Sequence, residues 1–251
     1  MTKLFTISRL MIFGLTVIGV ALAITAALLF SVLSGEASAR EILEDAQDAN
    51  RTVQTYKFTM DFWQTPQVEG DPPRFETSTE AVVVFDQGMH VIIRGNDDSY
   101  GESLLLHGWQ YKREAPDGAW EKYPSNFDSS RMATLDSTKH LQIVNGLIDS
   151  TVVGEETLDG VQVKKITGRF DLQQRAQDIW GDAQEGTQDP RQQMSAGRED
   201  LVGWVGVEDG LIHAYEVSGS YPAAGDLLPF EFWYRVRFSK FDESLALPSV
   251  E

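Results

Sequence analysis

The stretch "LVGWVGVEDGLIHAYEVSGSY" (residues 201–221) decides the fold class. Two runs of apolar and aromatic residues flank Glu208-Asp209-Gly210, and in each run these residues alternate with small or polar ones. A period of two is typical of a strand with one buried face, and a short acidic segment that ends in glycine favours a tight reversal of the chain. Residues 201–221 are therefore predicted to form an antiparallel hairpin.

The same pattern recurs on both sides of this hairpin. Residues 56–62 alternate apolar and polar side chains, and residues 79–95 and 150–171 each contain two strand-like runs around a glycine-containing turn. Near the C-terminus, five apolar side chains share one parity of a single run: Phe230, Phe232, Tyr234, Val236 and Phe238. Strands do not alternate with long helices, so a parallel sheet is not expected.

Three segments break the strand pattern. Residues 132–147 are predicted to form one or two short helices, and residues 172–200 a short helix near 172–180 followed by a long mobile loop. Residues 40–55 are predicted to form an amphipathic helix, because apolar residues recur there at spacings of three and four: Ile42, Ala46, Ala49 and Val53.

These elements predict a mainly β (α+β) fold. About nine or ten consecutive antiparallel strands are expected, arranged as a single curved antiparallel sheet or a half-open β-barrel covered by one or more helices. Because a sheet of this size must cover its concave face, residues 40–55 and 132–147 are the predicted cover.

A second stretch, "LLLHGWQYKREAPDGAWEKYP" (residues 104–124), is predicted to form two short strands around Pro116-Asp117-Gly118. It is rich in aromatic residues: Trp109, Tyr111, Trp120 and Tyr123. Aromatic side chains favour strands, so each of them fits an ordinary core. Collectively they also fit the lining of an apolar cavity, because a curved sheet with few covering helices leaves part of its inner face unfilled. Both interpretations stay open.

The N-terminus predicts an extracytoplasmic location for residues 40–251. Lys3 and Arg9 are followed by an uncharged apolar run over residues 10–33. That run is long enough for a membrane-spanning helix of about 20 residues. Ala37-Ser38-Ala39, however, has the small-x-small pattern of a signal-peptide cleavage site.

Two alternatives follow for residues 1–39, which form either a cytoplasmic N-terminus plus a membrane anchor or a signal peptide. The length of the apolar run favours a single-pass anchor; cleavage after Ala39 would give a secreted protein. Under both alternatives the positive-inside rule places residues 40–251 outside the cytoplasm.

Charge and cysteine content exclude several classes of partner and site. The formal net charge is −17, which argues against nucleic acid as a partner, because phosphate binding needs clustered Lys and Arg. An anionic membrane surface would also repel the chain unless its charges were segregated onto one face. The chain has no cysteine, so disulfides, thiolate metal sites and a lipid-modified cysteine are excluded.

No catalytic constellation stands out. The sequence lacks the nucleophile elbow, the phosphate-binding loop and the zinc-protease motif. The four histidines are isolated from one another: His90, His107, His140 and His213. No cofactor, metal site or catalytic residue is predicted. A binding function is therefore expected rather than an enzymatic one, and a hydrolase on the same scaffold is the least supported hypothesis.

Five phrases in a fixed order carry a resemblance to a known group. They are "TVQTYKFTMDFW", "HGWQYKREAPDGAWEKYP", "VVGEETLDGVQVKKITGRFD", the hairpin of residues 201–221 and "VRFSKFDESLALPSVE". Their layout and turn chemistry, over residues 40–248, resemble the bacterial lipoprotein-carrier fold of LolA and LolB, shared by the LppX/LprG-type lipoproteins of mycobacteria. Resemblance of this kind concerns the fold first and function only by analogy.

The resemblance implies a half-barrel sheet wrapped over helices, with an apolar cavity for acyl chains. It implies an extracytoplasmic binder or carrier of lipid or of acylated protein. Many members are anchored through a lipidated cysteine; here the N-terminal helix would replace that anchor. The residues expected to line the cavity are strand aromatics and a methionine of inward parity, together with Trp120: Phe58, Met60, Phe62, Trp109, Tyr111, Trp120, Trp204, Phe232 and Tyr234.

One alternative function remains on the same fold, an envelope sensor or regulatory interaction module with no transport role. In that case the acidic insertion of residues 172–200 would contact an envelope protein. The expected partners are thus lipid or acylated protein, the membrane through the N-terminal helix, and an envelope protein under the alternative.

Overall fold

The computed structural model describes residues 37–65, 74–85, 87–96, 98–124, 146–180 and 188–250. Within it, Ala39–Glu251 forms a compact unit that contains the hydrophobic core. The apolar run of the predicted anchor or signal peptide, and nearly all of the predicted helical segment 132–147, lie outside the described residues. In the part of the chain that is described, no helix combines the length and apolar composition needed to cross a membrane.

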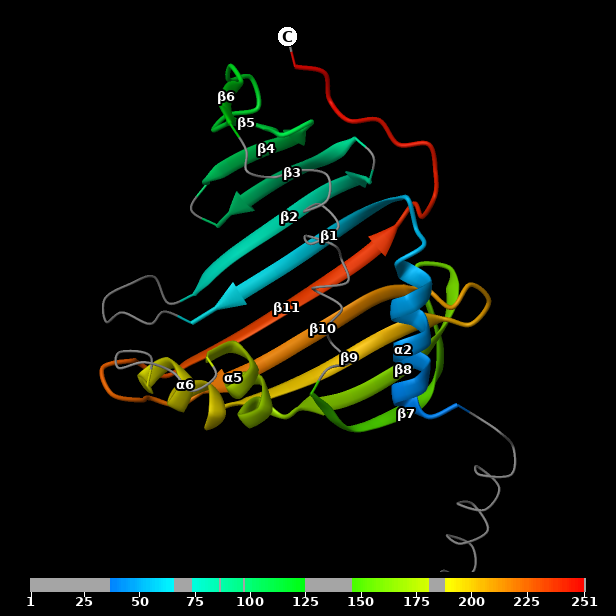
Figure 1. The fold of residues 1–251 in the computed structure, drawn as a ribbon, viewed down its shortest axis with the longest axis vertical. Coiled ribbons are helices and arrows are strands. Elements are labelled where there is room, and N and C mark those ends of the chain that lie inside the picture. The colour runs from blue at the N-terminus through cyan, green and yellow to red at the C-terminus, as the bar shows by residue number, and fades with distance from the viewer. Residues whose placement is uncertain are drawn as a thin grey trace, which may run out of the picture. The chain divides into compact units, whose positions relative to one another are not determined.

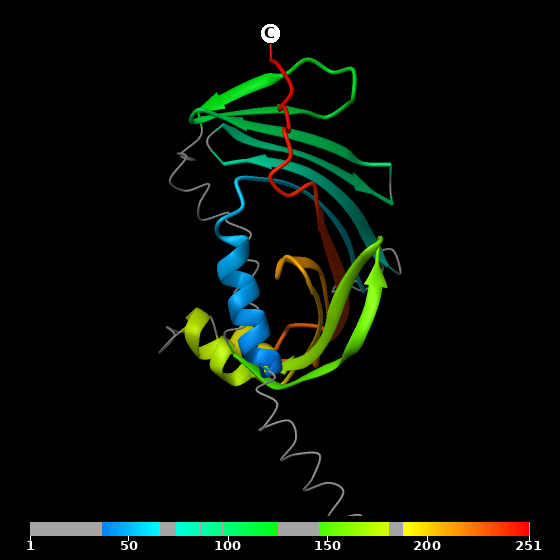
Figure 2. The same cartoon turned by 90° about the vertical axis from the view of Figure 1, so that its right-hand side faces the viewer.

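One antiparallel sheet of eleven strands dominates the unit, in the order β6-β5-β4-β3-β2-β1-β11-β10-β9-β8-β7. Figures 1 and 2 show that the sheet is strongly curved, and its edge strands β6 and β7 do not pair with each other. The predicted mainly β fold with a single curved, unclosed sheet is therefore confirmed. The strands are β1 (Thr55–Gln64), β2 (Phe75–Val84), β3 (Gly88–Gly95), β4 (Tyr100–Leu106), β5 (Trp109–Arg113), β6 (Glu121–Pro124), β7 (Leu147–Leu158), β8 (Val161–Phe170), β9 (Arg198–Gly206), β10 (Ile212–Tyr221) and β11 (Phe230–Ser239).

The strand order reflects two simple meanders. Strands β1 to β6 pair with their sequence neighbours, and so do β7 to β11. The two meanders join where β1 pairs with β11, with Phe58 opposite Phe238 and Met60 opposite Val236. Residues directly opposite each other share a face of the sheet. The alternate apolar side chains of the first strand and those of the last strand therefore form one surface.

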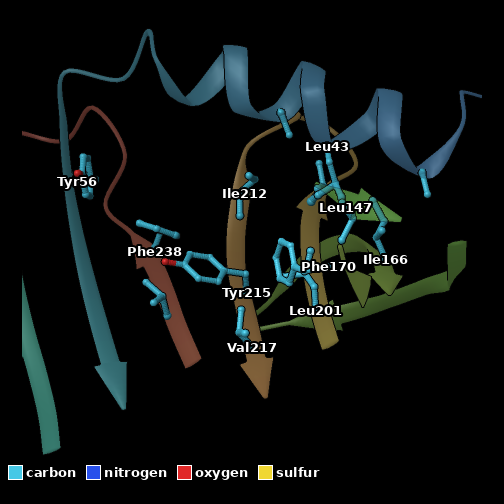
Figure 3. Packing of buried hydrophobic residues seen from close by; sticks show 14 of the residues in the cluster. Leu43, Tyr56, Leu147, Ile166, Phe170, Leu201, Ile212, Tyr215, Val217 and Phe238 are labelled. Atoms are coloured by element: carbon cyan, nitrogen blue, oxygen red, sulfur yellow. The ribbon is translucent and has the colours of Figure 1, made fainter. Parts of the chain in front are cut away.

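Helix α2 (Ala39–Asn50) covers part of one face of the sheet, where it contacts β7, β9 and β10. We call this face the inner face and the opposite one the outer face. Figure 3 shows Leu43 pointing from the helix toward the residues of these strands. Gly203 of β9 faces the helix, because a Cβ atom at this position would lie in van der Waals contact with Leu43 Cδ2, at 3.4 Å.

The predicted amphipathic helix is confirmed, but it is shorter than residues 40–55. It ends at Asn50, whose buried side chain accepts a hydrogen bond of 2.8 Å from the Ile212 amide of β10. Leu43 is buried, whereas Ile42 and Ala49, which were expected on the apolar face, are only partly buried. Asn50 can be buried although it is polar, because its side-chain oxygen accepts a hydrogen bond from a backbone N–H group.

The stretch of residues 104–124 contains parts of three strands instead of two. Residues 104–106 belong to β4, and a tight turn at His107 (φ 49°) and Gly108 (φ 81°) precedes β5. Two consecutive positive φ values are the conformation that two-residue hairpin turns require. The sequence interpretation missed this turn and treated residues 104–109 as part of one strand, although Gly108 is a residue that favours a turn. The predicted turn at Pro116-Asp117-Gly118 is present between β5 and β6.

The insertion of residues 172–200 is also more ordered than expected. Helix α5 (Leu172–Trp180) matches the prediction, but α6 (Gln188–Ser195) and the start of β9 occupy part of the predicted mobile loop. Gln193 of α6 is buried and donates to the carbonyl oxygens of Pro222 and Leu228 at 2.9 and 2.8 Å. Helix α6 was not predicted because its sequence is polar and lacks an apolar period, and hydrogen bonds of a side chain hold it in place.

Candidate functional site

An apolar pocket lies on the inner face beside the region that α2 covers. Its volume is about 210 Å³, and its lining comes from five strands. The lining residues are Tyr56, Phe58 and Met60 of β1, Thr79 of β2, Met89, Val91 and Ile93 of β3, Tyr215 of β10, and Val236 and Phe238 of β11. None of these residues is charged, so the pocket suits a ligand without charge at the point of contact.

Strand register explains why these residues meet. Met60 of β1 lies opposite Val236 on one side and Thr79 on the other, and Thr79 lies opposite Ile93 of β3. Residues opposite one another across antiparallel strands point to the same face. Tyr56, Phe58 and Met60, which alternate with polar residues along β1, therefore belong to one apolar surface that continues across four neighbouring strands.

Aromatic rings form the wall of the pocket nearest the core. The ring centroids of Tyr56 and Phe238 lie 5.8 Å apart, and those of Tyr215 and Phe238 lie 6.0 Å apart. Figure 3 shows Tyr215 and Phe238 pointing toward each other. Burial, followed by the neighbouring Tyr234 and Tyr56, raises the pKa of Tyr215 well above its ordinary value. The wall therefore stays uncharged at neutral pH.

The apolar surface continues past the pocket toward the end of β1. Phe62 lies two residues beyond Met60 on the same face, and its ring centroid is 6.3 Å from that of Phe75. Phe75 is 50% exposed and Ile93 is 44% exposed. From Tyr56 to Phe62 the surface runs for about 20 Å at a strand rise of ~3.3 Å per residue. None of the three described helices makes its main contacts with β1 to β4.

At its other end the inner face becomes polar beneath α5 and α6. Phe232 stacks between Tyr221 and Tyr234, with centroid separations of 5.7 and 6.2 Å. Tyr221 donates to the buried carboxylate of Glu199, which also accepts from Arg175. Burial, and then the charge of Glu199, raises the pKa of Tyr234 to about 12. These rings act as packed core, held in place by a satisfied ion pair.

Some of the predicted cavity residues meet at the pocket. Phe58 and Met60 line it, and Phe62 lies on the surface that continues from it. Phe232 and Tyr234 share the inner face but pack into the core cluster beside Tyr215 instead of lining the pocket.

The four predicted tryptophan and tyrosine positions outside β1 and β11 lie on the outer face. Trp204 packs against Val163 and Ala214, and its indole N–H donates to Glu156 at 2.6 Å. Trp109 and Tyr111 alternate with Gln110, which pairs with the inner-facing Leu105. Trp120 lies under the guanidinium of Arg113, an outer-face residue. These residues are not part of the pocket, because strand alternation alone does not say which parity the covering helix will bury.

None of the lining residues from β3, β10 and β11 was among the residues predicted to line the cavity. A signal was nevertheless present. The hairpin of β2 and β3 places Val91 opposite Ala81 and Ile93 opposite Thr79. Ala81 and Thr79 in turn lie opposite Phe58 and Met60 of β1. Val91 and Ile93 therefore share the face of Phe58 and Met60. Tyr215 and Phe238 had no such signal, because they meet β1 only through the pairing of the first strand with the last.

The described residues hold no group of three or more His, Cys, Asp or Glu side chains that could bind a metal ion. No protein-family model matches the sequence, and no curated protein is significantly similar to it.

Solved structures do match. The lipoprotein LppX from Mycobacterium tuberculosis is 13% identical, with 84% of this chain and 98% of that chain covered and a TM-score of 0.52. The chain has an LppX-like fold. LprF from Mycobacterium bovis gives the same TM-score at 14% identity, with 84% and 96% of the two chains covered. The predicted resemblance to the LppX/LprG type is confirmed at the level of the fold.

Proposed function

We propose that this protein is an extracytoplasmic, membrane-anchored binding protein for an acyl chain of a lipid or of a lipid-modified protein. The observation that carries the proposal is the apolar pocket on the inner face, together with the apolar surface that continues from it to Phe62 and Phe75. The LppX-like fold supports it, because such a sheet can hold a ligand between its inner face and its covering elements.

The dimensions favour a single chain. Drug-sized ligands occupy pockets of ~300–1,000 Å³, and this pocket of about 210 Å³ would take only part of a long acyl chain. The remaining methylenes would lie along the surface toward Phe62 and Phe75. That surface is about 20 Å long, and one leaflet of a bilayer has a hydrocarbon thickness of about 15 Å, so the lengths are comparable.

The energetics favour binding without a charged contact. Each methylene removed from water contributes about 0.8 kcal/mol, so ten buried methylenes supply ~8 kcal/mol before the cost of ordering the ligand. Thr79 is the least apolar of the lining residues, and its side chain is neutral. The headgroup of the ligand would therefore lie outside the pocket, and the site binds a chain instead of transforming it.

The N-terminal sequence supports the location. The apolar run of residues 10–33, preceded by Lys3 and Arg9, would anchor the domain on the extracytoplasmic side of the cell membrane. Such an anchor would take the place of the lipidated cysteine that this chain lacks. An anchored protein would present or receive acyl chains at the membrane where it sits.

A pair of adjacent substitutions tests the site. Val91 lines the pocket, whereas Ile92 is the next residue of β3 and points to the outer face. In residues 37–251, Val91→Trp fills the pocket and should weaken binding of a fluorescent long-chain fatty acid roughly tenfold, since displacing two methylenes costs ~1.6 kcal/mol. Ile92→Trp places the same side chain on the other face of the sheet and should leave the affinity unchanged.

Saturable binding in the wild type is the first requirement of this titration. Equal affinities of the wild type and of Val91→Trp would show that the ligand binds elsewhere. Absence of saturable binding in all three proteins would favour the alternative, an interaction module on the same fold.

A further inference from the structure

The hairpin of β5 and β6 carries a cluster that the proposed acyl site does not use. Four side chains share its outer face and form what we call the outer patch: Trp109, Tyr111, Lys122 and the adjoining Leu106 of β4. Leu106 lies directly opposite Trp109, and Tyr111 lies directly opposite Lys122. The patch lies at the end of the sheet, where β6 is an edge strand whose residues are all exposed.

The patch combines exposed aromatic surface with a positive charge. Trp109 is 42% exposed. The ammonium of Lys122 lies 4.1 Å from the ring centroid of Trp109 and 5.5 Å from that of Tyr111. Lys122 forms no ion pair with any carboxylate of the described residues, so its charge is available to an external anion. A cation held over an indole ring places a positive charge next to an apolar ring. The pair can therefore contact a surface that has both anionic and apolar groups.

Charges are segregated between the two faces of this hairpin. Glu121 lies opposite Lys112 in the strand register, on the inner side, where Tyr123 donates a hydrogen bond to the Glu121 carboxylate. Arg113 shares the outer face but is already paired with the buried Glu102 at 2.5 Å. The outer patch itself holds no carboxylate, whereas the chain as a whole has a formal net charge of −17. Near an anionic surface this patch is therefore the part of the hairpin that is attracted and not repelled.

We propose that the outer patch docks on an anionic lipid surface. Tryptophan and tyrosine are the residues that settle at the boundary between headgroups and acyl chains, because their rings are apolar and their N–H or O–H group stays hydrated. Lys122 would contact phosphate groups of the headgroups while Trp109 and Tyr111 insert between them. The patch faces away from the pocket, so docking and acyl binding use opposite faces of the same sheet.

Matched positions on the same hairpin test the proposal. Tyr123 is as exposed as Trp109, at 42%, and Lys112 lies 5.7 Å from its ring centroid on the opposite face. The variants are Trp109→Ala and Lys122→Glu, with Tyr123→Ala and Lys112→Glu as controls. Residues 37–251 are used because the core lies entirely within this compact unit and because the apolar run of residues 10–33 would bind vesicles by itself.

The measurement is co-flotation with vesicles of phosphatidylcholine, with and without phosphatidylglycerol. Wild-type protein should bind the vesicles that contain phosphatidylglycerol, and binding should weaken as salt is added. Lys122→Glu should weaken it at least roughly fivefold, the fold-change that corresponds to ~1 kcal/mol for a lysine near an anionic leaflet. Trp109→Ala should also weaken it, and the two controls should bind like the wild type.

Several results would overturn the proposal. They are equal binding to vesicles without phosphatidylglycerol, an equal loss in the control variants, and no vesicle binding by the wild type. Thermal unfolding of each variant shows whether a loss reflects misfolding. Uptake of the fluorescent fatty acid, measured on the same variants, should remain unchanged, so a failure of docking is distinguishable from a failure of the acyl site.

Discussion

Glu102 is a carboxylate that the sheet buries on its outer face. Its side chain is only 2% exposed, and it accepts hydrogen bonds from Tyr100 and from Arg113, while His90 Nε2 lies 2.7 Å from Oε1. Burial alone would raise the pKa of Glu102, but the hydrogen bonds from Arg113, Tyr100 and His90 outweigh it and lower the pKa from 4.5 to about 2. The network joins β3, β4 and β5 near the edge of the sheet.

This lowered pKa makes the stability of the fold depend on pH. A carboxyl whose pKa is lower in the folded state stabilises the fold above its unfolded pKa, and that contribution disappears as the pH falls from about 4.5 to about 2. At neutral pH, Glu102→Gln should lower the free energy of unfolding by roughly 3 kcal/mol, because the shift of the pKa from 4.5 to about 2 corresponds to ~3.4 kcal/mol at about 1.36 kcal/mol per pKa unit. Urea denaturation at a series of pH values should show the difference from the wild type shrinking over that range.

Glu80→Gln is the control for this experiment. Glu80 forms an exposed ion pair with Arg94 at 2.8 Å, and such pairs contribute less than about 1 kcal/mol. If Glu102→Gln and the wild type differ by the same amount at pH 7 and at pH 2, the network around Glu102 does not hold the charge as described.

At the level of single residues, strand alternation in the sequence indicated which side chains of one strand share a face of the sheet. Phe58 and Met60 were predicted to line a cavity, and both line the pocket. It could not distinguish them from Trp204, which has the same period-two setting but faces outward and donates to Glu156. The distinction depends on which face the helix covers, and that information is spread over the whole sheet.

Among the elements, α2 has the largest effect on the inner face. Leu43 is 2% exposed and packs in the core cluster with Leu201 and Val205 of β9, while Asn50 fixes the end of the helix to β10. The helix is held by an apolar contact in the middle and a hydrogen bond at its end. Its position decides that the pocket forms over β1 to β3, the part of the inner face that it leaves open.

Leu43→Ala should destabilise the domain by roughly 2–5 kcal/mol, the range for removing a buried leucine side chain and leaving a cavity. The exposed neighbour Asp45 provides the control, and Asp45→Ala should change the free energy of unfolding by no more than about 0.5 kcal/mol. Chemical denaturation monitored by tryptophan fluorescence measures both variants. A loss of under ~1 kcal/mol for Leu43→Ala would mean that α2 is not firmly docked.

Elements with a clear period could be read from the sequence, and those without one could not. The hairpin of β9 and β10 and the turn at Asp159 and Gly160 are where the pattern placed them. Helix α6 was missed because its residues are polar and its docking depends on Gln193, whose partners lie about 30 residues away on the chain. Local patterns do not record contacts of that separation.

For the whole molecule, the decisive contact is the pairing of β1 with β11. It brings together segments that are more than 160 residues apart in the chain and unites two meanders into one curved sheet. Sequence reasoning predicted a single curved sheet from the number of hairpins and the lack of long helices. It could not predict that Phe238 and Tyr215 would complete the pocket begun by Phe58, because that depends on this one long-range register.

The inner face therefore gives the domain its proposed role, and the pocket is its most specific feature. Native mass spectrometry of residues 37–251, purified without detergent and followed by organic extraction, tests that role most directly. We predict a bound species in the mass range of lipids that extraction removes. A protein that shows only its own mass, and still does so after incubation with an excess of a long-chain fatty acid, would contradict the proposed acyl site.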